Sequence, residues 1–324
     1  MEFCARLEDS VTAGAPLFGV YDHSTLYDKP GPDFHGRPGA RYLKWRMNSL
    51  GYRGPEMNPQ AKRVACVGAS ETFGLYESED GEWPRQLERF LRDLPVTVIN
   101  TAYAATNLQT HMHQAPRMLA EVKPDLILLY TSVAAYVHPA YYGVTNNPGA
   151  PAWHSRLAVK AKALAKRLIP AAWILPLRYW MIEKSMRGRE NEIMDRIPVE
   201  HEALFVRDLD QLLDVYASHG VPVILITHAN RFGDRVTPEE LPMLVTWRQF
   251  YPILREEGFL DMEARLNAQI RRIGAARDIP VVDAAKAVPP GPRYFADFVH
   301  FTDEGAAIFA QTVSEAVRQH PAVH

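Results

Sequence analysis

A chain of 324 residues that is 47% hydrophobic and 23% charged can bury a substantial core, which excludes a disordered or fibrous protein. Its formal net charge of -2 argues against a nucleic-acid binder that relies on overall basicity. Two cysteines, Cys4 and Cys66, cannot build a disulfide framework. The first residues lack the basic start and apolar stretch of a secretory signal, so we expect a cytoplasmic protein.

Residues 1–60 are rich in Gly, Pro, Tyr and Asp, and residues 29–39 (KPGPDFHGRPG) contain several turn signals. This composition predicts an irregular or β-rich N-terminal extension. We expect the extension to pack on a main domain that spans residues 61–324.

From residue 63 onward, apolar segments of strand length alternate with amphipathic segments that have helical spacing. The predicted strands are residues 63–68, 96–100, 125–130, 221–228 and 279–284. The predicted helices are residues 83–94, 111–122, 208–220, 264–278 and 303–320. Continuous apolar strands separated by such helices predict a doubly wound α/β fold, in which helices flank a parallel sheet.

Residues 140–200 form an insertion in this alternating pattern. Basic residues lie beside large apolar ones, and the apolar part is too short and too interrupted by charge to span a membrane. Two interpretations stay open. The insertion is a helical cap packed on the main domain, or its residues 153–189 form an interfacial surface that touches lipid or a partner.

Ser70 follows the first predicted strand of the α/β unit, after the small residues Gly68 and Ala69. Ligands of open parallel sheets bind outside the carboxyl ends of the strands, and small neighbours let another molecule approach a hydroxyl there. An isolated serine at this position could merely cap the next helix. A nucleophile also needs a base, and Asp297 and His300, just before the last helix, offer a histidine with an orienting carboxylate.

These segments resemble the SGNH hydrolases, also called the GDSL esterase/lipase family. Residues 68–74 (GASETFG) are similar to the family's Gly-Asp-Ser block, and residues 297–305 (DFVHFTDEG) are similar to its Asp-x-x-His block. Residues 47–56 (MNSLGYRGPE) resemble a lead-in seen in many bacterial members. The resemblance covers about residues 45–135 and 205–320, and it implies a flavodoxin-like three-layer fold.

The resemblance implies that Ser70 is the nucleophile, His300 the general base, and Asp297 the group that orients His300. It also implies an oxyanion hole that includes the backbone N–H groups of Ser70 and Ala102. The family's third block carries an Asn that donates to the oxyanion, and this sequence has Ala134 there. Loss of one such donor typically lowers kcat by ~10²–10³. Candidate substitutes in the sequence neighbourhood are Asn107, Thr131, Ser132, Tyr136 and His138.

Other polar residues give weaker indications. His228 and Arg231 follow a predicted strand, where they would either contact substrate or hydrogen-bond the loop. His111 and His113 are two residues apart on a predicted helix, so they point to different faces and predict no shared metal site. The sequence has no Gly-rich dinucleotide fingerprint, P-loop or paired-cysteine zinc motif, so we expect no cofactor.

Three functions are compatible with these residues. The first is a serine hydrolase that cleaves a carboxylic ester, with an acyl or acetyl group, of a small-molecule or lipid-like substrate. The second is an acyltransferase that uses the same serine, and the third is a catalytically weak descendant that binds a ligand or partner. We expect neither a nucleic-acid partner nor a transmembrane segment, and the sequence does not select an oligomeric state.

Overall fold

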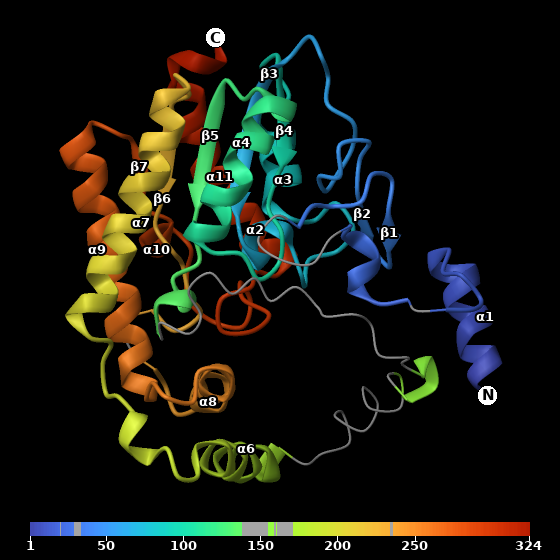
Figure 1. Ribbon diagram of the computed structural model, residues 1–324, viewed down its shortest axis with the longest axis vertical. Helices are drawn as coiled ribbons and strands as arrows, with labels where there is room; N and C mark the ends of the chain where they lie inside the picture. The colour runs from blue at the N-terminus through green and yellow to red at the C-terminus, as the bar shows by residue number, and fades with distance from the viewer. Residues whose placement is uncertain (20, 29–33, 138–154, 159, 161–170, 234–235) are drawn as a thin grey trace.

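The computed structural model describes residues 1–324 except 20, 29–33, 138–154, 159, 161–170 and 234–235 (Figure 1). Its centre is a five-stranded sheet of order β4-β3-β5-β6-β7, in which every neighbouring pair is parallel. The strands are β3 (Lys62–Gly68), β4 (Val96–Asn100), β5 (Leu126–Tyr130), β6 (Val223–Ile226) and β7 (Val281–Val282). The predicted α/β fold with a parallel sheet is confirmed.

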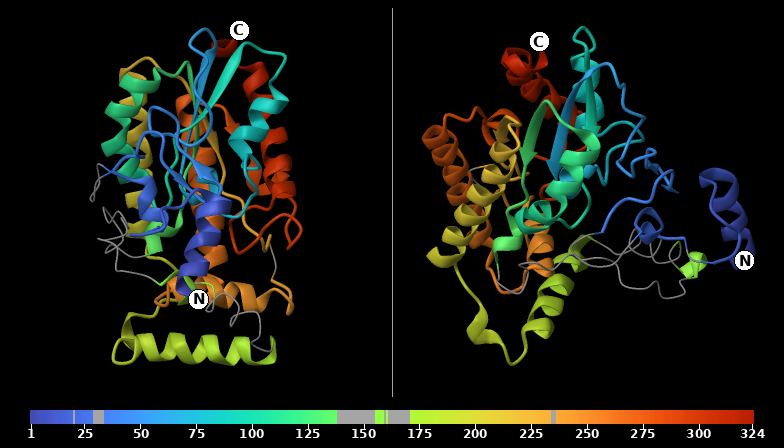
Figure 2. Two further views of the ribbon diagram at one scale, coloured as in Figure 1. Left: turned by 90° about the vertical axis from the view of Figure 1, so that its right-hand side faces the viewer. Right: turned by 45° about the horizontal axis from the view of Figure 1, so that its top comes forward.

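Helices cover both faces of this sheet (Figure 2). One face carries α4 (Leu108–Val122), α7 (Val199–Ser218) and α9 (Glu256–Arg277). The other carries α3 (Trp83–Phe90), α10 (Ala284–Ala287) and α11 (Asp303–Gln319).

Alternate residues of each strand enter the two hydrophobic cores. Ala65 and Val67 of β3 join the core under α4, α7 and α9, whereas Val64 and Cys66 join the core under α3 and α11. A strand buried on both faces must be apolar at every position, and this requirement explains the continuous apolar runs in the sequence.

Two helices on the first face extend further than the sequence predicts. α7 begins at Val199, not at residue 208, and α9 begins at Glu256, not at residue 264. The first turns of α9 contain Gly258, a poor helix former, yet a β-carbon there would lie 2.5 Å from the Leu254 side chain. Close packing therefore requires glycine where local propensity argues against a helix.

The N-terminal segment begins with a helix, which the sequence does not predict. Residues 2–13 form helix α1, which ends where Gly14 adopts a left-handed conformation with φ of 67°. Residues 2–13 contain neither Gly nor Pro, so no residue interrupts the helix before Gly14. Among the described residues of 1–60, the only strands are β1 (Arg41–Tyr42) and β2 (Trp45–Arg46), which pair antiparallel.

Part of the insertion is the helix α6 (Ala171–Met186), which lies against α8 (Leu241–Phe250). The Arg178 guanidinium donates to Thr246 and to a backbone carbonyl of α8, while Trp180 and Met181 are exposed. The packed side of α6 fits the cap interpretation, and the interfacial interpretation stays a prediction. Much of the 153–189 segment lies outside the described residues. Within the described part of the chain, no helix has the length and apolar character needed to cross a membrane.

The remaining elements are short. Within the described residues they include the helix α2 (Ser70–Phe73) and the 3₁₀ turns at His23–Leu26, Ala134–Val137, Glu190–Glu192 and Pro321–Val323. The strands run downward in Figure 1, so α2 and the loop before α11 meet near their carboxyl ends.

Candidate active site

Ser70 lies just after the carboxyl end of strand β3, which pairs with β4 and β5. The strand ends at Gly68, and α2 begins at Ser70. A β-carbon on Gly68 would lie 2.1 Å from the Thr72 hydroxyl oxygen and 2.6 Å from the Tyr130 carbonyl oxygen, so only glycine fits this turn. Because Ser70 is the first residue of its helix, its N–H has no acceptor within the helix.

Asp297 and His300 lie on the loop that leads into α11. Asp297 Oδ1 accepts hydrogen bonds from the backbone N–H groups of Val299 and His300, at 3.0 and 2.9 Å, which fix the carboxylate. Its Oδ2 lies 2.8 Å from His300 Nδ1. The other ring nitrogen of His300, Nε2, lies 2.9 Å from Ser70 Oγ. The structure therefore brings together the three residues that the sequence singles out, across 230 positions of chain.

The charges around this loop favour the protonated form of His300. Burial raises the pKa of Asp297, but the hydrogen bond and charge of His300 outweigh this effect, and the pKa of Asp297 is lowered. Burial lowers the pKa of His300, but the hydrogen bond to Asp297 and the charge of Glu71 outweigh it, and the pKa of His300 is raised above 6.5. A histidine with a raised pKa is a stronger base.

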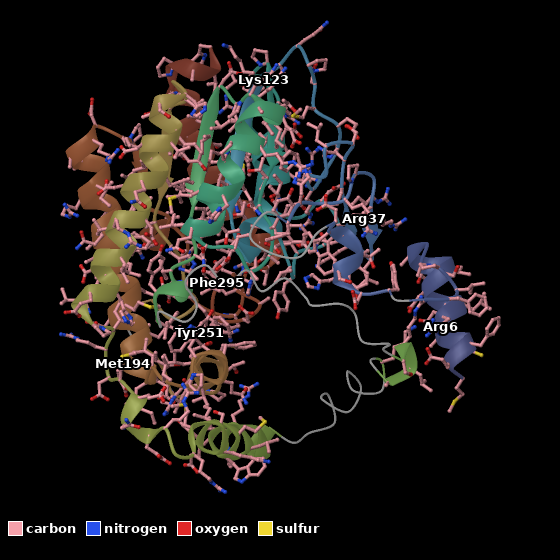
Figure 3. All side chains as sticks on the ribbon, viewed as in Figure 1. Arg6, Arg37, Lys123, Met194, Tyr251 and Phe295 are labelled. Atoms are coloured by element: carbon pink, nitrogen blue, oxygen red, sulfur yellow. The ribbon has the colours of Figure 1, made fainter. Side chains whose placement is uncertain are left out.

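Arg231, a candidate for substrate contact, instead supports this loop. Its backbone N–H donates to the Phe298 carbonyl at 3.0 Å, and its guanidinium donates to the Phe295 carbonyl at 3.3 Å. The guanidinium also forms an ion pair with Glu240. Figure 3 shows Phe295 close to the carboxyl ends of the strands. Arg231 therefore holds the backbone that carries Asp297.

Three charged side chains form a buried series of contacts that begins at Ser70, and we call them the Glu71–His228–Glu263 chain. The Ser70 hydroxyl donates to Glu71 Oε2 at 3.0 Å. His228 Nε2 lies 3.3 Å from Glu71 Oε1, and His228 Nδ1 lies 2.8 Å from Glu263 Oε2. All three side chains are buried, and the Tyr130 ring stacks on His228 with 5.3 Å between centroids. His228 thus acts on Ser70 only through Glu71.

The Glu71–His228–Glu263 chain is stabilised by an imidazolium between two carboxyl groups. Burial lowers the pKa of His228, but the charge and hydrogen bond of Glu263 and those of Glu71 raise it to about 10. Burial raises the pKa of Glu71, but the hydrogen bond from His228 and the charges of His300 and His228 lower it to about 2. Burial dominates at Glu263, whose pKa is raised. Glu71 therefore carries a negative charge beside Ser70.

A cavity of about 360 Å³ opens beside Ser70 and His300. Most of its lining is small or apolar, and it includes Ala69, Leu75, Tyr76, Ala104, Ala105, Thr106, Asn107, Ser132, Ala134, Ala135, Phe250, Tyr251, Phe298 and Val299. Tyr251, labelled in Figure 3, comes from the end of α8. The pocket therefore combines the loops after β3, β4 and β5 with the segment that ends α8.

Ala102, which the resemblance assigns to the oxyanion hole, does not line this cavity. Ala102 is fully buried, and its N–H donates to the Asn100 side chain at 3.2 Å. Three residues further on, Ala105 lines the cavity and has a φ of 64°. Glycine usually occupies such a left-handed position, so Ala105 is an alanine with a backbone conformation typical of glycine.

The other candidate residues separate into two groups. Asn107, Ser132 and Ala134 line the cavity. Asn107 Oδ1 accepts from the Thr110 N–H at 3.0 Å, which fixes the amide plane at the start of α4. Tyr136 lies away from the cavity lining, because its hydroxyl donates to Asp208 at 3.0 Å in the core.

Of the remaining sequence candidates, Thr131 is buried and its hydroxyl donates to the Ser132 carbonyl. His138 lies outside the described residues. Burial lowers the pKa of His111 to about 4, so His111 is a neutral core residue. Among the described residues, no group of three or more His, Cys, Asp or Glu has the geometry to hold a metal ion.

Sequence reasoning missed Glu71, Glu263 and the aromatic residues of the cavity. Glu71 directly follows the serine. Acidic residues are common in the first turn of a helix, so nothing in the sequence singles Glu71 out. Glu263 and Asn267 carried a usable signal, because they are polar residues four apart on the apolar face of α9. Asn267 accepts from the His228 N–H at 2.7 Å and donates to its carbonyl at 2.8 Å.

Several solved structures are similar to this chain. A member of the lipolytic protein G-D-S-L family from Veillonella parvula DSM 2008 is 14% identical, with a TM-score of 0.47 over 80% of this chain and 100% of that one. The lipase/acylhydrolase from Enterococcus faecalis is 15% identical, with a TM-score of 0.48 over 79% and 95% of the two chains. An acetyl xylan esterase is 14% identical, with a TM-score of 0.48 over 79% and 99%.

No family model matches the sequence, and no curated protein is similar to it. The G-D-S-L family of the Veillonella protein is the family that the two sequence blocks resemble.

Proposed function

We propose that this chain is a divergent SGNH-type serine hydrolase that cleaves a carboxylic ester through an acyl-enzyme. The observation that carries the proposal is the continuous line of polar contacts from Asp297 through His300 to Ser70, at 2.8 and 2.9 Å. A serine, a histidine and a carboxylate in this order activate a serine hydroxyl on several unrelated folds.

In the proposed mechanism, His300 Nε2 accepts the hydroxyl proton of Ser70 while Oγ attacks the ester carbonyl carbon. Asp297 accepts the Nδ1–H of His300, which fixes the tautomer and stabilises the imidazolium. The imidazolium then donates its proton to the leaving alcohol oxygen, and the acyl group stays on Ser70. Water, deprotonated by His300, attacks the acyl-enzyme and releases the acid.

We propose that three donors hold the oxyanion: the backbone N–H groups of Ser70 and Ala105 and the side-chain amide of Asn107. Ser70 and Ala105 lie on the loops after neighbouring strands, and both line the cavity. Asn107 supplies the side-chain donor that Ala134 lacks. Its fixed Oδ1 makes it a better oriented candidate than Ser132, another polar side chain of this lining.

The cavity favours an uncharged ester with an apolar acyl or alcohol group. Its side chains are mostly alanine and aromatic, and the charged groups among them are Glu71 and the Asp297–His300 pair. Two carboxylates disfavour an anionic substrate at the reacting centre. A volume of about 360 Å³ lies at the lower end of typical small-molecule pockets.

Intact-mass spectrometry after treatment with a fluorophosphonate tests the proposed nucleophile. Attack of Ser70 Oγ on phosphorus displaces fluoride, so the wild type should gain one adduct. Ser70→Ala and His300→Ala should gain none, while Ser132→Ala, which alters a serine of the same cavity, should retain the adduct. A wild type that gains no adduct would contradict the proposal and favour a ligand-binding descendant.

The acyltransferase alternative uses the same serine and differs only in the acceptor. The substrate p-nitrophenyl acetate separates the two. Hydrolysis is supported if acetate is the product and the rate does not depend on added alcohols or amines. A rate that depends on the acceptor, with the acetylated acceptor as the product, would replace hydrolysis by acyl transfer.

A further inference from the structure

The hydroxyl of Ser70 contacts two groups that can both accept its single proton. His300 Nε2 lies 2.9 Å from Oγ, and Glu71 Oε2 lies 3.0 Å from it. A hydroxyl donates one hydrogen bond and accepts others. Ser70 can therefore donate to only one of the two groups at a time.

Glu71 keeps its position and its charge through its other contacts. Its Oε1 lies 3.3 Å from His228 Nε2, and Glu263 holds the opposite ring nitrogen of His228 at 2.8 Å. The exposed fractions of Glu71 and His228 are 4% and 2%, so water does not replace these contacts. The Glu71 carboxylate therefore stays charged and in place next to the nucleophile.

We infer that Glu71 is a positioning residue that holds Ser70 in a waiting arrangement whenever His300 is protonated. This inference rests on the proposed function. In the waiting arrangement, His300 Nε2–H donates to Ser70 Oγ, and the Ser70 hydroxyl donates to Glu71 Oε2. When His300 loses the Nε2 proton to solvent, the Ser70 hydroxyl turns to donate to Nε2, and attack can begin. No proton is transferred between Ser70 and Glu71.

Glu71 thereby stabilises the protonated form of His300. The charged groups that face His300 are Asp297 on its own loop, Glu71 on α2, and Glu77 on the loop after α2. The Tyr76 ring also faces it, with 5.3 Å between centroids, and is neutral at ordinary pH because burial raises the pKa of Tyr76. Of these groups, Glu71 and Asp297 lie within one hydrogen bond of the proton-transfer pair. Glu71 therefore moves the activation of Ser70 to higher pH.

NMR titration of the His300 ring nitrogens tests this inference in the full chain, without any substrate. The His300 signal is identified by its absence in His300→Gln. Glu71→Gln preserves a side chain that can accept from Ser70 but removes the charge that raises the pKa of His300. Removal of a neighbouring opposite charge lowers the pKa of a histidine by about one unit or more. We expect the His300 midpoint to fall by about one pH unit in Glu71→Gln. The matched control, Glu263→Gln, alters the same chain without touching Ser70 and should cause a smaller decrease.

The pH dependence of fluorophosphonate labelling should show the same displacement, with the acidic limb of the labelling rate about one pH unit lower in Glu71→Gln. A His300 midpoint that Glu71→Gln leaves unchanged overturns the inference. If Glu71→Gln does not fold, the wild type decides, because a midpoint no higher than about 6.5 also overturns it. A protein that shows the NMR shift but no labelling would retain this inference about Glu71 while the proposed hydrolase activity fails.

Discussion

The Arg53 guanidinium donates to the Gly74 carbonyl oxygen at 2.7 Å, at the end of the short helix that Ser70 begins. The same group donates to the Phe73 carbonyl and forms a buried ion pair with Glu82 at 2.7 Å. A segment preceding the sheet therefore terminates the helix that carries the candidate nucleophile.

Arg53→Met should lower both stability and Ser70 reactivity. The variant leaves the Glu82 carboxylate buried without its cation, and breaking a buried pair in this way costs about 3–5 kcal/mol. Urea denaturation measures the free energy of unfolding, and the rate of fluorophosphonate labelling reports on Ser70. Arg53→Met/Glu82→Gln should recover part of the stability without recovering the rate. Equal stability of the single and double variants would count against the ion pair as the source of the loss.

Asn107 variants separate an oxyanion donor from a helix cap. Asn107→Asp and Asn107→Ser retain a side-chain oxygen that can cap α4, so their melting temperatures should stay near that of the wild type. Both lack the amide N–H, and kcat for an aryl ester should fall about 10²-fold. Asn107→Ala should show the same loss of kcat together with about 1 kcal/mol of lost stability. Unchanged kcat in the Asp and Ser variants would show that another group replaces the missing donor.

The raised pKa of His228 predicts a loss of stability at alkaline pH. The folded-state pKa is about 10 and the ordinary value is 6.5, so the folded protein retains a proton that the unfolded chain releases in this interval. The resulting stabilisation is fully present below pH 6.5 and is lost as the pH rises toward 10, with a slope of up to about 1.4 kcal/mol per pH unit. Urea unfolding at pH 7, 8 and 9 measures this slope. The slope should be flatter in His228→Gln, and an equal slope in both proteins would refute the assignment of the effect to His228.

Phe250 should influence the preference for the acyl group. Its ring lies 5.9 Å from that of Phe298 at the edge of the cavity, and 62% of the residue is exposed. An apolar acyl chain can bury part of this exposed ring, whereas an acetyl group is too short to reach it. Phe250→Ala should raise KM for a medium-chain ester by about tenfold, which corresponds to about 1.4 kcal/mol, with a smaller effect on the acetate ester. The same change of KM for both esters would place the acyl chain elsewhere.

The sequence predicted the parallel sheet and the Ser70–His300–Asp297 arrangement because both leave local signals. Continuous apolar strands identify a sheet that is buried on both faces, and a strand that ends at Gly68 and Ala69 marks an exposed serine. The order of the blocks then indicated which histidine and which aspartate belong to that serine.

The features that the sequence did not predict depend on contacts between distant segments. The proposed role of Ala105 rests on its left-handed backbone conformation, and an alanine in the sequence gives no sign of that conformation. Glu71 and Glu263 are far apart in the sequence, and only tertiary packing places His228 between them. Arg231 likewise follows a strand as a ligand-binding residue would, but its hydrogen bonds go to the loop around Asp297.

The distance along the chain between Ser70 and His300 also affects how the protein is synthesised. Their side chains are joined across 230 positions, and the loop that carries His300 follows the last strand of the sheet. During synthesis on the ribosome, the residues of α2 are therefore added long before His300, the proposed base. Until β7 and α11 have docked, Ser70 lacks the base that the proposed mechanism requires, so the proposed activity cannot begin before the sheet is complete.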